Sequence, residues 1–136
     1  MIKSIILGAA MLGAGALGTV ALYEVATPGA HIELSVQGTE LHTGTFVTPD
    51  PTHPAAGTFQ IVSDGNGGRV IQTNADFSIV NAPDPHFRVN GKVIAKIVNV
   101  KGINEYPIPN FIGDIESVHA WCEIADVNLG TGVLDD

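Results

Sequence analysis

The chain has 136 residues, a length that suits one domain, and 45% of them are hydrophobic against 15% charged. This composition excludes disorder over most of the chain. Lys and Arg number 6 against 14 Asp and Glu, for a formal net charge of -8, and so few cations argue against nucleic acid as a partner. The single Cys excludes an intramolecular disulfide and any zinc or iron–sulfur cage built from several cysteines.

The first 26 residues predict an export signal that is either cleaved or retained as a membrane anchor. Lys3 precedes an uncharged, largely apolar stretch from Ser4 to Tyr23, which is close to the ~20 residues that a spanning helix needs. Thr19-Val20-Ala21 is a tolerable cleavage site, although no clean Ala-x-Ala occurs. Both fates stay open, and the anchor is favoured. We therefore expect the protein at the periplasmic or extracellular face of a membrane.

The rest of the chain predicts a linker over residues 27–38 and a β domain over 39–136. Thr27-Pro28-Gly29 ends any helix, because proline lacks the amide donor. Apolar residues then alternate with polar ones rather than recurring at helical spacing, as in 58–62, 77–80 and 87–89. We expect an all-β fold, a single β-sandwich or barrel-like domain preceded by the N-terminal hydrophobic helix.

Turn signals rich in Gly, Pro, Asn and Asp separate the expected strands. They fall at Asp50-Pro51, 64–68, 81–85, Asn90-Gly91, Lys101-Gly102 and 130–132. The stretch 64–68, Asp-Gly-Asn-Gly-Gly, lacks the remaining acidic positions of a calcium loop. It predicts a hairpin turn.

Two sets of side chains alternate along the expected strand near the C-terminus. One face carries Val118, Ala120, Cys122 and Ile124, and the other carries His119, Trp121 and Glu123. This pattern predicts that Cys122 points inward. The apolar residues that follow are one residue out of step, which predicts a bulge or bend over 123–126.

Several short motifs along the domain together resemble one family. They are Gly44-Thr45-Phe46, His53 with Gly57, Asp76-Phe77, Pro83-Asp84-Pro85, Tyr106-Pro107-Ile108-Pro109, 118–123, 127–130 and Leu134. They resemble the electron-transfer DM-thirteen domain, the module of the animal Skeletor protein and of small exported bacterial proteins. The tryptophan–cysteine pair in a late strand is the most specific element. The chain departs from the family pattern at His86 and Arg88, and again over 129–133.

The resemblance implies an extracytoplasmic redox domain centred on its one cysteine. Cys122 is the expected redox residue, either as a bare thiol or as the attachment point of a prosthetic group such as haem. His53 is the second candidate for binding that group, and the alternative is a solvated loop histidine. The expected partner is a redox protein or another protein of the cell surface, with the membrane reached through the N-terminal segment.

The residues alone leave a second function open. A free cysteine on an apolar face is commonly a buried core residue. The five histidines show no pairing typical of metal ligands, so no metal site is predicted, and the lack of Cys-x-x-Cys-His excludes covalent c-type haem. No hydrolase or transferase motif occurs. The alternative is a non-enzymatic β-sandwich binding module with a structural cysteine.

Overall fold

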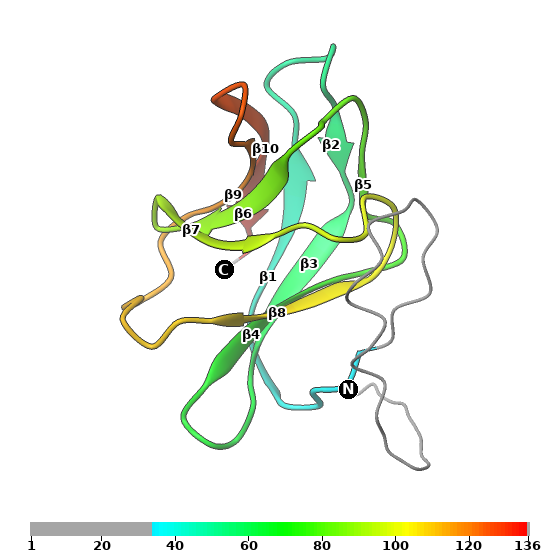
Figure 1. Ribbon diagram of the computed structural model, residues 1–136. Coiled ribbons are helices and arrows are strands. Elements are labelled where there is room, and N and C mark those ends of the chain that lie inside the picture. The colour runs from blue at the N-terminus through cyan, green and yellow to red at the C-terminus, as the bar shows by residue number, and fades with distance from the viewer. Residues whose placement is uncertain (1–33, 136) are drawn as a thin grey trace.

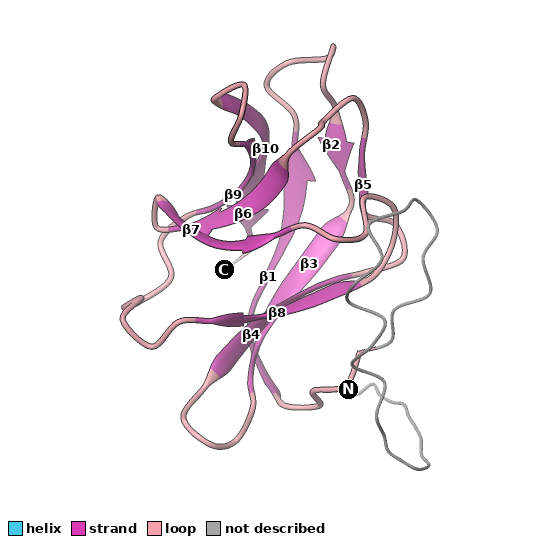
Figure 2. Ribbon diagram, viewed as in Figure 1, coloured by secondary structure: helices cyan, strands magenta, loops and turns pink. Residues whose placement is uncertain are grey.

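Every regular element in the described part of the chain is a β-strand, which confirms the predicted all-β fold (Figure 2). The computed structural model describes residues 34–135. The expected N-terminal hydrophobic helix, with the predicted signal or anchor over 1–26, lies outside these residues. Residues 34–135 contain no helix with the length and apolar character needed to cross a membrane.

Within residues 34–135, ten strands form two antiparallel sheets (Figure 1). Their bounds are β1 Thr39–Val47, β2 Ala55–Ala56, β3 Thr58–Ser63, β4 Arg69–Thr73, β5 Ser78–Ile79, β6 Pro85–Val89, β7 Lys92–Lys96, β8 Asn104–Ile108, β9 Val118–Cys122 and β10 Val127–Leu134. Eight of them form one curved sheet in the order β7-β6-β9-β10-β1-β3-β4-β8, and β2 pairs with β5. The turns predicted over 64–68 and at Asn90-Gly91 are confirmed, because they join β3 to β4 and β6 to β7.

A buried polar cluster brings the two edges of the large sheet together and nearly closes a barrel. Tyr106 Oη accepts a hydrogen bond from Val98 N at 2.6 Å and donates one to Asn104 Oδ1 at 2.7 Å. The Asn104 side-chain amide donates to the Asn99 carbonyl at 2.8 Å and to Thr73 Oγ1 at 3.1 Å. Buried polar groups need such partners to offset their desolvation. Side-chain hydrogen bonds therefore join β8 to the segment that follows β7.

Aromatic rings fill the interior of the curved sheet. Neighbouring centroids lie 4.8–6.0 Å apart within the set Phe46, Phe59, Phe77, Phe87 and Tyr106. Rings at this separation bury large apolar areas and add favourable ring contacts. They form the centre of the core.

The prediction of a turn at 130–132 is wrong, because these residues lie within β10. Close packing explains their glycines. A Cβ on Gly132 would lie 2.9 Å from the Phe59 ring, and a Cβ on Gly44, on neighbouring β1, would lie 2.4 Å from the same ring. A Cβ on Gly130 would lie 2.8 Å from Ala55 Cβ. Glycine within a strand here marks close approach to other groups rather than a change of direction.

The strand that carries the cysteine follows the predicted alternation until it ends. Val118, Ala120 and Cys122 are buried, which confirms their common inward face. The placement of Ile124 on that face is wrong, since this side chain is 76% exposed. The physical reason is that β9 ends at Cys122 and the chain reverses through a turn over 123–126 into β10, instead of bending and continuing.

The first described residues are tied to the sheet by the buried carboxylate of Glu105. Its Oε1 accepts hydrogen bonds from Ser35 N at 3.0 Å and Ser35 Oγ at 2.5 Å. Its Oε2 accepts from Val36 N at 2.9 Å and from Gln72 Nε2 at 2.8 Å. A buried carboxylate needs such donors to offset the cost of its desolvation. Ser35 and Val36, within the expected linker, are thereby fastened to the β domain.

Candidate functional site

Cys122 lies at the end of β9 with its side chain in the core. It is 2% exposed and forms no disulfide. Its partners in the strand register are Pro85 on β6 and Val127 on β10. A buried thiol in apolar surroundings is usually inert, because reagents and partners do not reach the sulfur.

His53 lies in the connection between β1 and β2. Its Nδ1 donates a hydrogen bond to the Asn81 carbonyl at 3.0 Å, and its backbone N donates to the Asp50 carbonyl at 3.0 Å. These bonds fix the loop against the segment after β5. No hydrogen bond or ion pair joins His53 to Cys122, so the structure shows no interaction between the two residues predicted from the sequence.

Haem, which the family resemblance implies, does not fit Cys122 as it is placed. An axial ligand must present its donor atom to a pocket that admits the macrocycle. The Cys122 sulfur is instead enclosed by the core. The His53 Nδ1 bonds to the Asn81 carbonyl, which leaves Nε2 as the ring nitrogen that could bind a group. Across residues 34–135, no group of three or more His, Cys, Asp or Glu side chains is placed to hold a metal ion.

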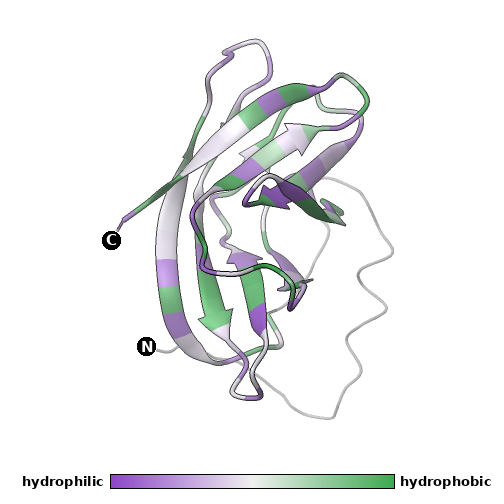
Figure 3. Cartoon of the chain, turned by 90° about the vertical axis from the view of Figure 1, so that its left-hand side faces the viewer, coloured by the Kyte–Doolittle hydropathy of each residue, from purple (hydrophilic) through white to green (hydrophobic). Residues whose placement is uncertain are grey.

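The outward face of β6 and β9 gathers the other side chains with chemical potential. In the strand register His86 faces Trp121, and Arg88 faces His119. Glu123 follows directly after β9 and contacts Arg88. We call the side chains of His86, Arg88, His119, Trp121 and Glu123 the Trp121 platform. Figure 3 shows hydrophilic and hydrophobic residues alternating along the strands, and the burial pattern of β6 and β9 alternates in the same way.

Arg88 is the centre of the platform. Its Nε and Nη2 donate to the two carboxylate oxygens of Glu123 at 2.8 and 2.7 Å, a bidentate ion pair. Its guanidinium carbon lies 4.3 Å from the centroid of the Trp121 ring, within range of a cation–π interaction. The hydrogen bonds from Arg88 lower the pKa of Glu123, and the same bonds raise the pKa of Arg88. Both groups therefore stay charged at neutral pH.

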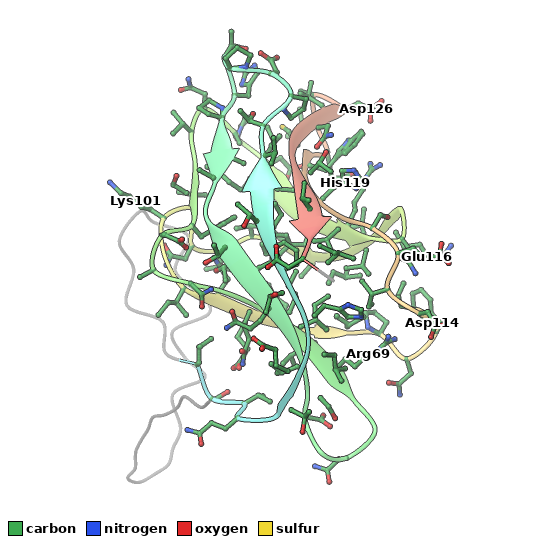
Figure 4. All side chains as sticks on the ribbon, turned by 180° about the vertical axis from the view of Figure 1, so that it is seen from behind. Arg69, Lys101, Asp114, Glu116, His119 and Asp126 are labelled. Atoms are coloured by element: carbon green, nitrogen blue, oxygen red, sulfur yellow. The ribbon has the colours of Figure 1, made fainter. Side chains whose placement is uncertain are left out.

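Two further contacts fix the orientation of the Trp121 ring. Its Nε1 donates to Asp126 Oδ1 at 3.1 Å. The His119 ring lies edge-on to it, with centroids 6.0 Å apart and an interplanar angle of 85°. Burial, and secondarily the charge of Arg88, lowers the pKa of His119. His119 is therefore neutral at pH 7, and Figure 4 shows it on the same side of the domain as Asp126.

Charged and apolar groups border the platform. Asp84 Oδ1 lies 3.7 Å from His86 Nδ1 and 3.4 Å from Lys96 Nζ. Exposed valines lie on the same outward side of the neighbouring strands. They are Val93 on β7, Val133 on β10 and Val47 on β1. Val93 is in register with Arg88. Val47 is in register with Thr131, which itself faces His119, and Val133 lies two residues along β10 from Thr131.

Sequence reasoning did not assign a role to the platform as a unit. The alternation placed His119, Trp121 and Glu123 on one face, and Arg88 was noted as a departure from the family pattern. No pattern in the sequence indicated that β6 pairs with β9, since these strands are neighbours in the sheet but not in the sequence. Opposite charges at Arg88 and Glu123 were the one signal that could have suggested it.

Comparison with known proteins found no matching family model, no matching curated protein and no matching solved structure. The resemblance to the DM-thirteen domain therefore stays a prediction from the motifs.

Proposed function

We propose that this domain is a non-enzymatic binding module at the cell surface, that a partner protein docks on the Trp121 platform, and that Cys122 is structural. The arrangement around the only tryptophan of the chain carries this proposal. A guanidinium stacks on the ring, one carboxylate holds that guanidinium, and another holds the indole N–H. The location at the cell surface rests on the N-terminal sequence over residues 1–26.

The platform supports binding because its long side chains are already ordered. Association costs free energy when side chains of many rotamers become fixed, and groups fixed beforehand avoid part of that cost. Arg88 is held by two hydrogen bonds and Trp121 by one. Trp and Arg are also the residue types most enriched among the side chains that dominate binding energy at protein interfaces.

The surroundings of the platform favour a protein over a glycan as the partner. The outward valines Val93, Val133 and Val47 extend an apolar border from β7 to β1. Those strands span five positions of the sheet, or about 19 Å at the usual strand spacing. This breadth suits a partner surface of roughly 800 Å² per side. The guanidinium of Arg88 already covers one part of the ring that a sugar would need for stacking.

Electron transfer through Cys122, expected from the family resemblance, stays a prediction. A redox thiol has to be reached by an oxidant, a partner or a cofactor. The 2% exposure of Cys122 supports the structural alternative. Rapid alkylation of the folded protein, or a coloured group in the preparation from its native compartment, would restore the redox hypothesis.

Photo-crosslinking in the cell of origin tests the binding proposal. The photoreactive residue p-benzoylphenylalanine is placed in the full chain at Val93 or Val133, which border the platform, and at Val80 as the matched control. Val80 is an exposed valine that follows β5, outside the platform. We expect the same protein adduct from Val93 and Val133, and none from Val80.

A second substitution ties any adduct to the platform. Trp121→Ala in the crosslinking chains should remove the adduct while the circular dichroism of the purified protein stays β-rich. Adducts from Val80 as strong as those from Val93, or adducts that survive Trp121→Ala, would overturn the proposal. If the only adduct contained an oligosaccharide, the partner would be a glycan and not the proposed protein.

A further inference from the structure

We propose that Asn66 is a site of spontaneous deamidation in the folded protein, whereas Asn90 is protected. The sequence has two Asn-Gly pairs, Asn66-Gly67 and Asn90-Gly91, and each lies in a hairpin turn. A following glycine favours the reaction, because it has no side chain to hinder attack by its backbone nitrogen. The two pairs share their chemistry, so any difference between them reflects the fold.

The reaction needs only the chain and water. The backbone N of Gly67 attacks Cγ of Asn66, a new C–N bond forms, and the side-chain nitrogen leaves as ammonia after taking up the amide proton. The product is a five-membered succinimide. Water then opens the ring at either carbonyl, which gives aspartate or isoaspartate at position 66. No oxidation or reduction takes place.

Neither reacting group at Asn66 is engaged by another part of the domain. Asn66 and Gly67 are exposed, and within residues 34–135 neither the Asn66 side chain nor the Gly67 backbone N forms a hydrogen bond. No atom lies within 4 Å of the place that a Gly67 Cβ would occupy. The side-chain amide of Asn66 can therefore rotate toward the Gly67 nitrogen without breaking a protein contact.

Asn90 has the opposite environment in the β6–β7 turn. Its Nδ2 donates to the Asp114 carbonyl at 2.7 Å. Its Oδ1 accepts from Glu116 N at 2.7 Å and from Ser117 N at 3.1 Å. These bonds hold the side-chain amide against the 109–117 loop. Ring closure at Asn90 therefore has to break three hydrogen bonds that Asn66 lacks.

Deamidation would change both the charge and the geometry of the β3–β4 turn. Asp64 Oδ1 accepts hydrogen bonds from Asn66 N at 2.7 Å and from Gly68 N at 3.0 Å. A carboxylate at position 66 makes the net charge one unit more negative and lies near Asp64. Isoaspartate also inserts a methylene into the backbone between these two donors. We expect the turn to lose at least one of the Asp64 bonds.

Peptide mapping of the aged protein tests the proposal. The purified full chain is incubated at mildly alkaline pH, and mass spectrometry with fragmentation follows deamidation at Asn66 and Asn90 separately. We expect Asn66 to convert at least about tenfold faster than Asn90, which corresponds to about 1.4 kcal/mol in barrier height. Asn66→Gln, whose longer side chain disfavours the five-membered ring, should remove the early acidic form seen on ion exchange.

Incubation in denaturant provides the internal control, because unfolding removes the hydrogen bonds of Asn90. There the two rates should approach each other. Equal rates in the folded protein would overturn the proposal, as would a folded Asn66 that stays intact while the unfolded one converts. A rate difference that persists in denaturant would also overturn it, since the neighbouring sequence and not the fold would then explain it.

Discussion

Trp121 and Cys122 are adjacent in β9, and yet they lie in opposite environments. The Cys122 thiol is enclosed by the core, while the Trp121 ring lies outside the sheet between Arg88 and His119. A single step along a strand moves a side chain from one face of the sheet to the other. The two neighbours therefore have separate roles: Cys122 contributes to the stability of the core, and Trp121 is available for recognition.

The largest expected contrast lies between neighbours on the partner strand β6. Phe87 is fully buried among the aromatic rings, so Phe87→Ala should lower the free energy of unfolding by about 3–5 kcal/mol. Arg88→Ala removes an outward ion pair and a cation–π contact and should cost about 1 kcal/mol. Urea denaturation of both variants measures the difference. Equal costs would mean that the two faces of β6 are not distinct.

Substitution of Cys122 should mainly lower the stability of the fold. Cys122→Ser places a hydroxyl in an apolar site, at a cost of roughly 1–3 kcal/mol in unfolding free energy. Cys122→Ala is the matched control, because it removes the sulfur without adding a polar group. We expect slow alkylation of the native thiol and fast alkylation after unfolding. Fast alkylation in the native state would contradict the enclosed position.

Trp121→Ala should cost less than a core substitution of the same size. Truncation of a largely buried indole would cost about 3–5 kcal/mol. The ring lies on the outward face and loses one cation–π contact and one hydrogen bond, so we expect about 1–2 kcal/mol. Denaturation followed by circular dichroism gives the value. A cost above that of Phe87→Ala would show that Trp121 belongs to the core.

The fold class followed from the sequence because alternation and turn residues are local signals. The hairpin turns over 64–68 and at Asn90-Gly91 needed no knowledge of distant residues. The glycines of 130–132 misled for a physical reason. Glycine serves both turns and close packing, and only the position of the Phe59 ring reveals which applies.

The candidate site was only half predictable. The alternation placed Cys122 inward and His119 and Trp121 outward, and the burial pattern of β9 agrees. The partnership of Arg88 with Trp121 and Glu123 depends on the pairing of β6 with β9, which no local pattern encodes. His53 was chosen by motif alone, and its contacts are those of a loop residue.

The smallest expected effects are changes in how the free energy of unfolding depends on pH. They distinguish two groups of the platform, His119 and Glu123. Burial lowers the pKa of His119 below its ordinary value of 6.5. The unfolded chain therefore binds the proton more readily, and stability falls as the pH drops from about that value toward the folded pKa. The bonds from Arg88 lower the pKa of Glu123 below 4.5. The stability from that ion pair is full above 4.5 and is lost as the pH falls through the folded pKa.

Each substitution should remove the pH dependence of stability in one pH range. His119→Gln should make the urea midpoint of unfolding nearly independent of pH at and just below pH 6.5. The loss of stability at more acidic pH should remain. Glu123→Gln should reduce the fall below pH 4.5 and leave the upper pH range unchanged. Each change should stay under about 1 kcal/mol, because both groups are only partly buried and solvent screens their charges. Urea midpoints measured across the pH range by circular dichroism resolve the two. If the urea midpoint of His119→Gln still fell as steeply below pH 6.5, another group would have to titrate there. The statement that His119 is neutral in the platform would then be wrong.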